Sequence, residues 1–542
     1  MKYPTVYSLF ADRIRKYASE AKEPKDVFYF RSGDRWQGIS WQRFEQETFD
    51  FATALLSYGL KRGGSVCILM GNVPEWPISD VGTIIAGGVG VGLYPTSSAE
   101  QIAYIIDHSD AEFVLVDSRA QLQRVLSVRD QLSKVRHVIA LDPDAPSGED
   151  VVAYRDFVER GRAERSRLAP LLKERAEGAK PDDVAIMVYT SGTTGAPKGA
   201  CLSHRYIINS VESLRQTIPI YDTDVSFSYL PFCHVAERIS GLYNRLYAGA
   251  SAYFVDDLAR LSEYMLEVKP TVFASLPRFF EKIHARAAAD MDRLPQAEHA
   301  DFLATKVKNY FGGRIRLATS GGAPLPLEVA EFLAAAGLPI LQAYGLTENV
   351  CVAFNRPYEY KFGTVGPPMP GCEVRIAADK EILVRSEMMF SGYYKAPDET
   401  VKVFSDGWLL TGDLGEFDED GFLKIIGRKK ELIVTSTGKK VSPALLENML
   451  KEHPAISQAM VYGEGRSYLV ALITVNAAIP RETIQSIIDG VNRRVSSTES
   501  IKRFAVLDRD FEIERDEITP TGKLKRDVIT NRFREVIDEL YA

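Results

Sequence analysis

At 542 residues the chain exceeds the size at which one hydrophobic core stops growing, so two or more domains are expected. Its 45% hydrophobic and 26% charged residues are typical of a globular protein, and a net charge of −7 argues against a nucleic-acid-binding protein, which would carry a basic face. The five cysteines are scattered without a C-x-x-C pair, which argues against a disulfide framework and a zinc site.

The N-terminus and the apolar runs indicate whether the chain carries a signal peptide or a membrane-spanning segment. Residues 1–4 lack the apolar core of a signal peptide, and the most apolar run, residues 81–94, is too short and too rich in glycine to span a bilayer. We therefore expect a cytoplasmic protein without a transmembrane segment. Peripheral contact with a membrane and assembly as a homodimer both stay open.

The first part of the chain is predicted to alternate between strands and helices. A helix over residues 5–21, a hairpin over 27–38 and a helix over 41–60 that Ser40 caps come first. Apolar strands are then expected at residues 66–70, 89–94, 113–116 and 138–141, with helices at 78–86, 99–107 and 121–132. This alternation indicates a mostly parallel sheet covered by helices on both faces.

A hydroxyl- and glycine-rich loop follows a helical connector over residues 162–180 and an apolar strand over 184–188. It reads Tyr189-Thr190-Ser191-Gly192-Thr193-Thr194-Gly195-Ala196-Pro197-Lys198-Gly199-Ala200. Glycines allow close backbone approach, so that N–H groups, hydroxyls and one lysine can converge on a polyphosphate. On composition alone a solvated turn is the alternative. The P-loop of NTPases does not match, because it needs Gly-Lys followed by Ser or Thr, whereas Lys198 precedes Gly199.

The predicted pattern of secondary structure changes twice in the second half of the chain. Strands and helices alternate to about residue 335, and Gly and Pro then cluster at residues 363–371. The shorter strands that run to about residue 426 indicate an antiparallel subdomain. Beyond Arg428 the pattern is that of a small α+β unit ending in a helix over 527–541. The predicted fold class is therefore α/β, with large parallel sheets, an antiparallel subdomain and a small α+β unit.

Six further strings carry candidate site residues. They are YLPFCHVAER at residues 229–238, ATSGGAPL at 318–325, QAYGLTE at 342–348, GWLLTGDLG at 407–415, GRKKELIV at 427–434 and ITPTGKLKR at 518–526. Each string alone has an ordinary structural interpretation. His234 could be structural, Glu237 and Arg238 could form a surface ion pair, and Lys525 and Arg526 are expected to be solvated.

Taken together and in this order, the loop and the six strings resemble the motifs of the adenylate-forming superfamily, which comprises acyl- and aryl-CoA synthetases, luciferases and the adenylation domains of peptide synthetases. The resemblance extends from Tyr189 to Arg526, over most of the chain. It implies a large N-terminal domain over residues 1–427, a hinge over 428–432 centred on Lys430, and a small mobile C-terminal domain over 433–542. It also implies ATP, Mg²⁺ and CoA as cofactors.

The resemblance assigns roles to individual residues. Lys523 would bridge the substrate carboxylate and the α-phosphate, His234 would lie on the substrate side, and Thr347 would reach the α-phosphate. Thr190 and Glu348 would hold Mg²⁺, and Gly438 and Lys440 would contact CoA. The nucleotide-binding residues would be Thr190, Ser191, Gly192, Thr193, Thr194, Gly195, Lys198, Gly321, Gly322, Ala323, Gln342, Ala343, Tyr344, Gly345, Thr347, Asp413, Arg428 and Lys523.

The implied activity is that of an ATP-dependent acid–thiol ligase. It would make acyl-AMP with release of pyrophosphate and then transfer the acyl group to CoA. The string from Leu230 to Arg238 resembles the form found among long-chain fatty acid–CoA ligases. A medium-chain or aryl acid, loading of a carrier protein and a catalytically silent adenylate-binding protein are the alternatives. The chain ends at Ala542 without a carrier domain, which argues against a peptide-synthetase module.

Overall fold

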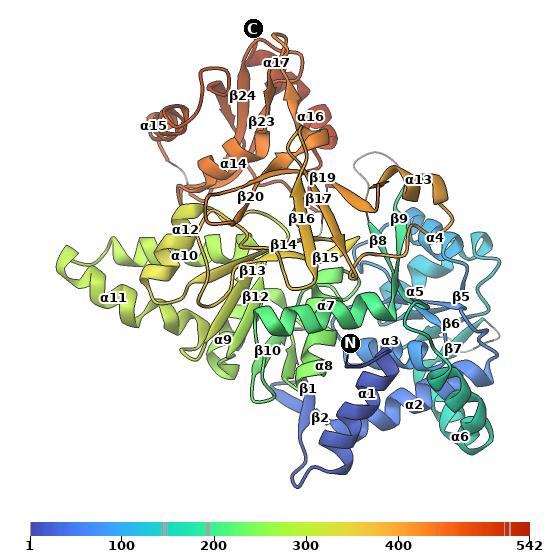
Figure 1. Ribbon diagram of the computed structural model, residues 1–542. Helices are drawn as coiled ribbons and strands as arrows, with labels where there is room; N and C mark the ends of the chain where they lie inside the picture. The colour runs from blue at the N-terminus through green and yellow to red at the C-terminus, as the bar shows by residue number, and fades with distance from the viewer. Residues whose placement is uncertain are drawn as a thin grey trace.

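The computed structural model describes residues 2–142, 144, 148, 150–190, 196–477, 479–513, 515–519 and 522–542, and only the backbone of residue 304. A large part contains three sheets and an antiparallel subdomain, and a small C-terminal part lies on top of it in the view of Figure 1. None of the helices in the described residues is long and apolar enough to cross a membrane.

A seven-stranded sheet is the first of the large part. Its order is β7-β6-β5-β3-β4-β8-β9, and every neighbouring pair is parallel except β8 and β9. The strands are β3 (Ser65–Leu69), β4 (Val89–Gly92), β5 (Ala111–Val116), β6 (His137–Ala140), β7 (Val151–Ala153), β8 (Val184–Thr190) and β9 (Lys198–Ser203).

Helices cover both faces of this sheet, as the sequence predicts. Phe113 and Leu115 of β5 belong to one apolar core, and the alternate residues Val114 and Val116 belong to another. This alternation follows from the two-residue period of a strand. The covering helices are α2 (Trp41–Ser57), α3 (Glu75–Ile85), α4 (Ala99–His108), α5 (Arg119–Leu126) and α6 (Tyr154–Glu177).

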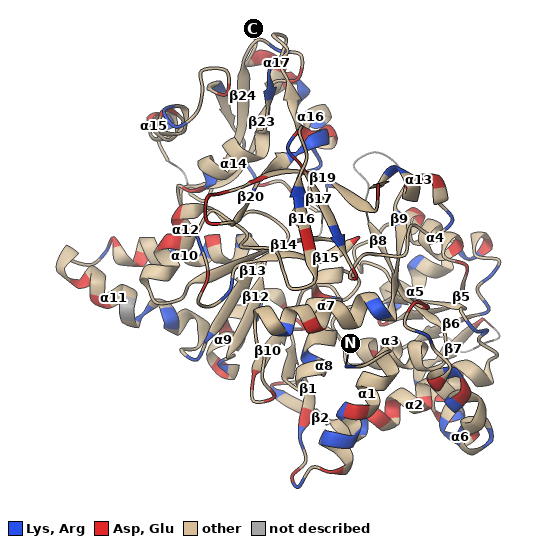
Figure 2. Cartoon of the chain, viewed as in Figure 1, with Lys and Arg blue, Asp and Glu red and all other residues tan. Residues whose placement is uncertain are grey.

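Two of these helices begin for different reasons. Nearby residues decide where α2 begins, whereas contacts with a distant element decide where α6 begins. Ser40 caps α2 as predicted, because its Oγ accepts a hydrogen bond of 3.1 Å from the Arg43 N–H. Helix α6 begins before its predicted start, since Phe157 is fully buried against α2. At Gly161 a Cβ atom would lie 1.9 Å from the Asp50 carbonyl oxygen, so α6 crosses α2 where only glycine fits. Lys and Arg are interspersed with Asp and Glu along α6 (Figure 2).

Two four-stranded sheets complete the parallel architecture. Their orders are β10-β11-β1-β2 and β12-β13-β14-β15, and in each the last pair is antiparallel. The strands are β1 (Asp26–Ser32), β2 (Arg35–Ser40), β10 (Val225–Ser228), β11 (Ser251–Phe254), β12 (Val272–Ser275), β13 (Leu317–Ser320), β14 (Ile340–Leu346) and β15 (Asn349–Phe354). The helices around them are α1 (Val6–Ile14), α7 (His204–Thr217), α8 (Asn244–Ala248), α9 (Leu261–Val268), α10 (Pro277–Met291), α11 (His299–Thr305) and α12 (Leu327–Ala335), with π-helical turns η1 (Arg15–Ser19) and η3 (Ala236–Tyr243).

The antiparallel subdomain and the C-terminal part follow in the chain. The subdomain holds β16 (Cys372–Ile376), β17 (Glu381–Ser386), α13 (Pro397–Lys402), β18 (Phe404–Ser405), β19 (Trp408–Phe417) and β20 (Leu423–Arg428). The C-terminal part has its own apolar core, which includes Ile433 and Phe504. Its elements are β21 (Ile433–Val434), β22 (Lys440–Val441), α14 (Pro443–Lys451), β23 (Ile456–Tyr462), β24 (Leu469–Val475), α15 (Arg481–Asn492), β25 (Ile501–Val506), α16 (Arg526–Arg532) and α17 (Arg534–Glu539). The predicted fold class is confirmed.

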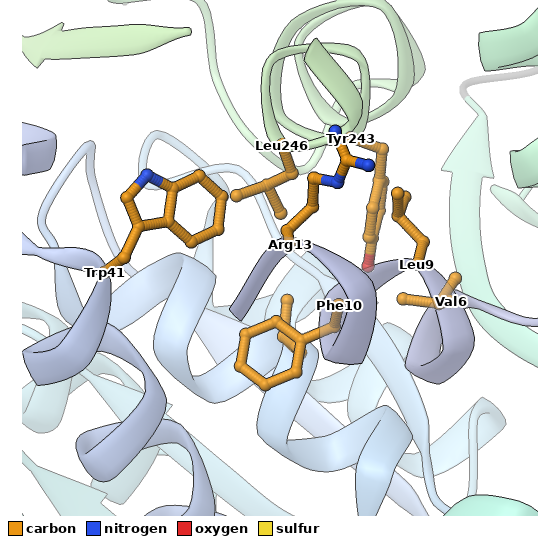
Figure 3. Close-up of a pocket in the computed structure, with 8 residues that line it drawn as sticks. Val6, Leu9, Phe10, Arg13, Trp41, Tyr243 and Leu246 are labelled. Atoms are coloured by element: carbon orange, nitrogen blue, oxygen red, sulfur yellow. The ribbon is translucent and has the colours of Figure 1, made fainter. Parts of the chain in front are cut away.

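A small cavity lies where α1 packs on α8 and η3. Phe10, Arg13, Trp41 and Tyr243 are among the residues that line it (Figure 3). Its volume of about 10 Å³ is the space of one water molecule. None of the residues that line it belongs to the motifs described above, so we interpret it as a packing gap.

The buried His204 is expected to make stability depend on pH. It is 3% exposed, and its Nδ1 accepts a hydrogen bond of 3.2 Å from the Val6 N–H, which ties α7 to α1. Burial lowers its pKa to about 4. Between about pH 6.5 and 4 the unfolded chain therefore binds more protons than the folded chain. The free energy of unfolding should fall as the pH falls through this window, by up to about 3 kcal/mol.

Urea denaturation at pH 7.5 and pH 5 measures this dependence. A His204→Gln variant keeps an acceptor but does not titrate, so its free energy of unfolding should change less between the two pH values. The same change in both proteins would show that His204 is not responsible.

Candidate active site

The predicted phosphate loop begins at the end of β8. Ser191, Gly192, Thr193, Thr194 and Gly195 lie outside the described residues. On either side of them, Thr190 ends β8 and Lys198 begins β9, and these two residues pair across the antiparallel ladder. The strand β9 was not predicted. Lys198 forms an ion pair with Glu399 of α13, and its Nζ lies 5.3 Å from the centroid of the Tyr393 ring.

Two other predicted motifs meet at the ends of β13 and β14. These strands are parallel neighbours, and Ser320 pairs with Gln342. The Gln342 Oε1 accepts a hydrogen bond of 3.1 Å from the Leu325 N–H, which fixes the turn that holds Gly321, Gly322 and Ala323. At Gly322 the φ angle is +80°, which favours glycine. Four of the nucleotide-binding candidates therefore lie in β14 beside that turn: Gln342, Ala343, Tyr344 and Gly345. The apolar pattern of the sequence predicts a strand only over residues 339–341.

Asp413 and Arg428 come together on neighbouring strands of the antiparallel subdomain. Asp413 of β19 pairs in register with Arg428 of β20. The Asp413 Oδ1 accepts a hydrogen bond of 2.7 Å from the Arg428 Nε, and its Oδ2 accepts one of 2.7 Å from the Tyr344 hydroxyl. Burial and this carboxylate both raise the pKa of Tyr344. Because a carboxylate has about four lone-pair sites, Asp413 can still accept further hydrogen bonds from a ligand.

Thr347 and Glu348 stand at the turn after β14. The Tyr206 hydroxyl donates a hydrogen bond of 2.9 Å to the Thr347 carbonyl oxygen. The Glu348 Oε1 accepts a short hydrogen bond from the Tyr393 hydroxyl. Among the described residues, none donates to its Oε2, which leaves one carboxylate oxygen of Glu348 for a ligand.

Lys523 stands in the C-terminal part of the chain. Its N–H donates to the Thr519 Oγ1 at 3.0 Å, and its carbonyl oxygen accepts from the Thr519 N–H at 2.8 Å, so a tight turn carries it. Burial and Arg428 lower the pKa of Lys523, whereas Asp413, Glu431 and Glu348 act to raise it. The charges that influence its pKa therefore belong to three other motifs, and the side chain itself is exposed.

His234 follows β10 and precedes the π-helical turn η3. Its Nδ1 accepts a hydrogen bond of 3.2 Å from the Ala236 N–H, so the proton of the neutral ring sits on Nε2. Burial, with a contribution from the charge of Lys523, lowers its pKa to about 4. At neutral pH His234 therefore presents an uncharged N–H donor.

Family models match nearly all of this architecture. The model described as AMP-binding enzyme matches residues 16–394, and the model described as AMP-binding enzyme C-terminal domain matches residues 430–542. The chain belongs to the AMP-binding enzyme family. The predicted resemblance is confirmed.

Relatives and solved structures agree with this membership. The chain is 33% identical to the long-chain-fatty-acid–CoA ligase FadD15 of Mycobacterium tuberculosis, over 97% of this chain and 96% of the relative. It is 30% identical to the long-chain-fatty-acid–CoA ligase ACSBG1 of Rattus norvegicus, over 99% of this chain and 85% of the relative. The fold is similar to that of the anthranilate CoA ligase AuaEII in complex with anthranoyl-AMP, with a TM-score of 0.81, 21% identity and coverage of 98% and 97%. ATP-bound MatB from Rhodopseudomonas palustris gives a TM-score of 0.75, 24% identity and coverage of 98% and 99%.

In this AMP-binding enzyme, the structure excludes the alternative interpretation of Glu237 and Arg238 as a surface ion pair. Both side chains are buried, and they point to different partners because neighbouring residues of a helical turn do not face each other. Arg238 pairs with Asp80 of α3, which also accepts a hydrogen bond of 2.7 Å from the Tyr243 hydroxyl. Glu237 pairs with Arg245 of α8.

The expectation that Arg526 is solvated is also wrong. Its two terminal nitrogens donate hydrogen bonds of 2.7 Å each to the two carboxylate oxygens of Glu447, so the pair is bidentate. Lys525 pairs with the exposed Asp516. The proposed hinge residue Lys430 is exposed in a short 3₁₀ turn, and Gly438 and Lys440 are exposed around the β21–β22 hairpin.

Several residues that shape the site carried no signal in the sequence. One is His108, whose Nδ1 lies 2.8 Å from the hydroxyl of Tyr189, the first residue of the loop string. Tyr393 and Glu399, which contact Glu348 and Lys198, lie outside every motif string. A single tyrosine or glutamate is too common to single out in a sequence, and only the fold places these side chains against the predicted ones.

Proposed function

We propose that this AMP-binding enzyme is a long-chain fatty acid–CoA ligase, which activates the acid as acyl-AMP and then transfers the acyl group to CoA. The observation that carries the proposal is the hydrogen-bonded cluster of Tyr344, Asp413 and Arg428, which come from three separate motifs. The charges of Asp413, Arg428 and Glu348 also influence the pKa of Lys523 in the C-terminal part. The names of relatives at 33% and 30% identity support the long-chain acid.

The chemistry follows from the charges in the site. A carboxylate is a poor acyl donor, because direct displacement would expel an oxide. When it attacks the α-phosphate of ATP, pyrophosphate leaves and AMP becomes the later leaving group. The step gathers negative charge, so fixed positive groups lower its barrier. We assign this role to Lys523, with the neutral His234 N–H orienting the acid and Thr347 contacting the α-phosphate.

The remaining nucleotide contacts are those that the family resemblance implies. Asp413 would accept the ribose hydroxyls, Arg428 would bind ribose or phosphate, and Tyr344 would stack on adenine beside the Gly321–Ala323 turn. The Thr190–Lys198 loop would carry the β- and γ-phosphates. A Mg²⁺ ion fits the open oxygen of Glu348, because Mg²⁺ commonly takes one or two carboxylates with phosphate oxygens and water. With Thr190 as a second ligand, the ion would neutralise phosphate charge.

The second half-reaction needs a thiol at the acyl carbon. Lys523 occupies one approach to that carbon, so we infer that the C-terminal domain, residues 433–542, turns about Lys430 relative to residues 1–427. Gly438 and Lys440 would then move toward the thiol. An aryl acid is the second candidate, because the similar fold of AuaEII is that of an anthranilate CoA ligase.

A panel of acids tests the function. ATP–pyrophosphate exchange should be fastest with long-chain fatty acids, and CoA should release AMP and form the thioester. Exchange that favours anthranilate or other aryl acids would contradict the long-chain assignment. Exchange that leads to transfer to a carrier protein, without a CoA thioester, would contradict the assignment of CoA as the acceptor. The absence of exchange with every acid would contradict the proposed ligase function as a whole.

A further inference from the structure

One arginine of the large part forms hydrogen bonds with the C-terminal part. Arg278 stands in the first turn of α10. Its guanidinium donates a hydrogen bond of 2.8 Å to the Ser457 carbonyl oxygen, one of 2.7 Å to the Ser457 Oγ and one of 3.0 Å to the Asp510 Oδ2. Ser457 is 2% exposed and lies in β23. The contact therefore joins the half-buried Arg278 of the large part to a buried residue of the C-terminal sheet.

The far side of this contact is held rigidly. The Asp510 Oδ2 also accepts a hydrogen bond of 2.7 Å from the Ser457 hydroxyl, and its Oδ1 accepts one of 2.5 Å from the Thr474 hydroxyl. Asp510 thus has partners for both oxygens before Arg278 is counted. A carboxylate held in one orientation loses little freedom when the arginine binds it, which favours a firm contact.

Asp510 is connected to the turn that carries Lys523. The neighbouring Arg509 donates hydrogen bonds of 2.6 and 2.7 Å to the two oxygens of Glu517, whose side chain is fully buried. The Glu517 carbonyl oxygen accepts a hydrogen bond of 2.8 Å from the Lys525 N–H, just beyond the turn. A fixed position of Asp510 therefore fixes the base of the Lys523 turn.

A second, weaker contact lies beside the first. Glu281, one turn further along α10, lies 3.7 Å from the Lys451 Nζ of α14 and 3.7 Å from an Arg278 nitrogen. Side chains from both parts of the chain line a small crevice here, among them Arg278, Glu281, Lys451 and Ile456. The first turn of α10 is thus a docking point for the C-terminal part.

We propose that Arg278 is a positioning residue for adenylation: its bonds to Ser457 and Asp510 hold the C-terminal domain in the arrangement that delivers Lys523 to the site, and they must break before the acceptor reaction. The inference rests on the proposed function. It separates Arg278 from the residues that touch substrate, because Arg278 acts only through Lys523.

Arg278→Ala tests the inference by its effect on the two half-reactions. Hydrogen bonds to charged groups are the stronger class, so the docked population, and with it ATP–pyrophosphate exchange at limiting acid, should fall roughly 10-fold. Acyl transfer to CoA from supplied acyl-AMP should stay the same or rise. Arg278→Lys, which keeps one bond, should lie between the two proteins. An equal loss of both half-reactions, or no change in either, would overturn the proposal.

A matched control and a second measurement make the test independent of activity. Arg293, whose side chain is 79% exposed near a carboxylate of its own segment, gives the control variant Arg293→Ala, which should leave both half-reactions unchanged. All five cysteines are buried, so spin labels can be placed at Tyr358→Cys and Glu482→Cys, one exposed site in each part. Arg278→Ala should broaden the distance between the labels even if no tested acid supports exchange. An unchanged distance distribution would contradict the proposed role of Arg278 in holding the C-terminal domain. A broadened distribution without exchange would contradict only the proposed ligase function.

Discussion

Replacement of Lys523 by alanine is expected to lower ATP–pyrophosphate exchange by a factor of about 10²–10³ or more, while transfer of the acyl group from supplied acyl-AMP to CoA continues. The loss of one fixed donor from a charge-stabilising site has an effect of this size. Arg428, Asp413, Glu431 and Glu348 all act on the charge of Lys523.

Lys525→Ala is the matched control for this prediction. Lys525 lies two residues further along and pairs with the exposed Asp516. Its loss should leave both half-reactions nearly unchanged. Single-turnover measurements of each half-reaction check both variants. Loss of both half-reactions in Lys523→Ala would contradict the division of labour, and exchange within about twofold of the unmodified protein would contradict the role of Lys523 itself.

The second large effect is expected at the buried ion pair of Asp80 and Arg238. Both side chains have 0% exposure, and the Arg238 Nε lies 3.1 Å from the Asp80 Oδ2. Asp80→Asn leaves the guanidinium charge buried without a counter-charge, which should destabilise the fold by about 3–5 kcal/mol. A Cβ at Gly90 would lie 2.5 Å from both partners, so the surroundings have little room to adjust. Urea denaturation at pH 7 measures the loss.

Two comparisons separate burial from charge in this experiment. Arg205→Ala breaks an ion pair with Asp182 whose side chains are 37% and 76% exposed, and it should cost less than about 1 kcal/mol. Joint replacement by Asp80→Leu and Arg238→Met removes both charges and should be less destabilising than Asp80→Asn alone. If Asp80→Asn were no more destabilising than Arg205→Ala, the pair would not stabilise the fold.

The local features of this protein could be predicted from its sequence. The Ser40 cap of α2, the alternation of strands and helices before residue 141 and the apolar strand before the phosphate loop each depend on residues close together in the chain. Family membership followed in the same way, since each motif is a short string whose order can be read along the chain. The start of α6 and the strand β9 were missed, because contacts with distant elements decide where they begin.

What the sequence by itself determined is therefore the class of fold, the family and the order of the candidate residues. The tertiary structure alone decided which of them meet. Asp80 lies 158 residues from Arg238 and Asp510 lies 232 residues from Arg278, so no local pattern relates them. Their pairing depends on how sheets and domains pack, and the same packing gives Glu237 and Arg238 separate buried partners. Charges in a low-dielectric interior must find partners wherever the fold places them, and only the folded chain shows which partners those are.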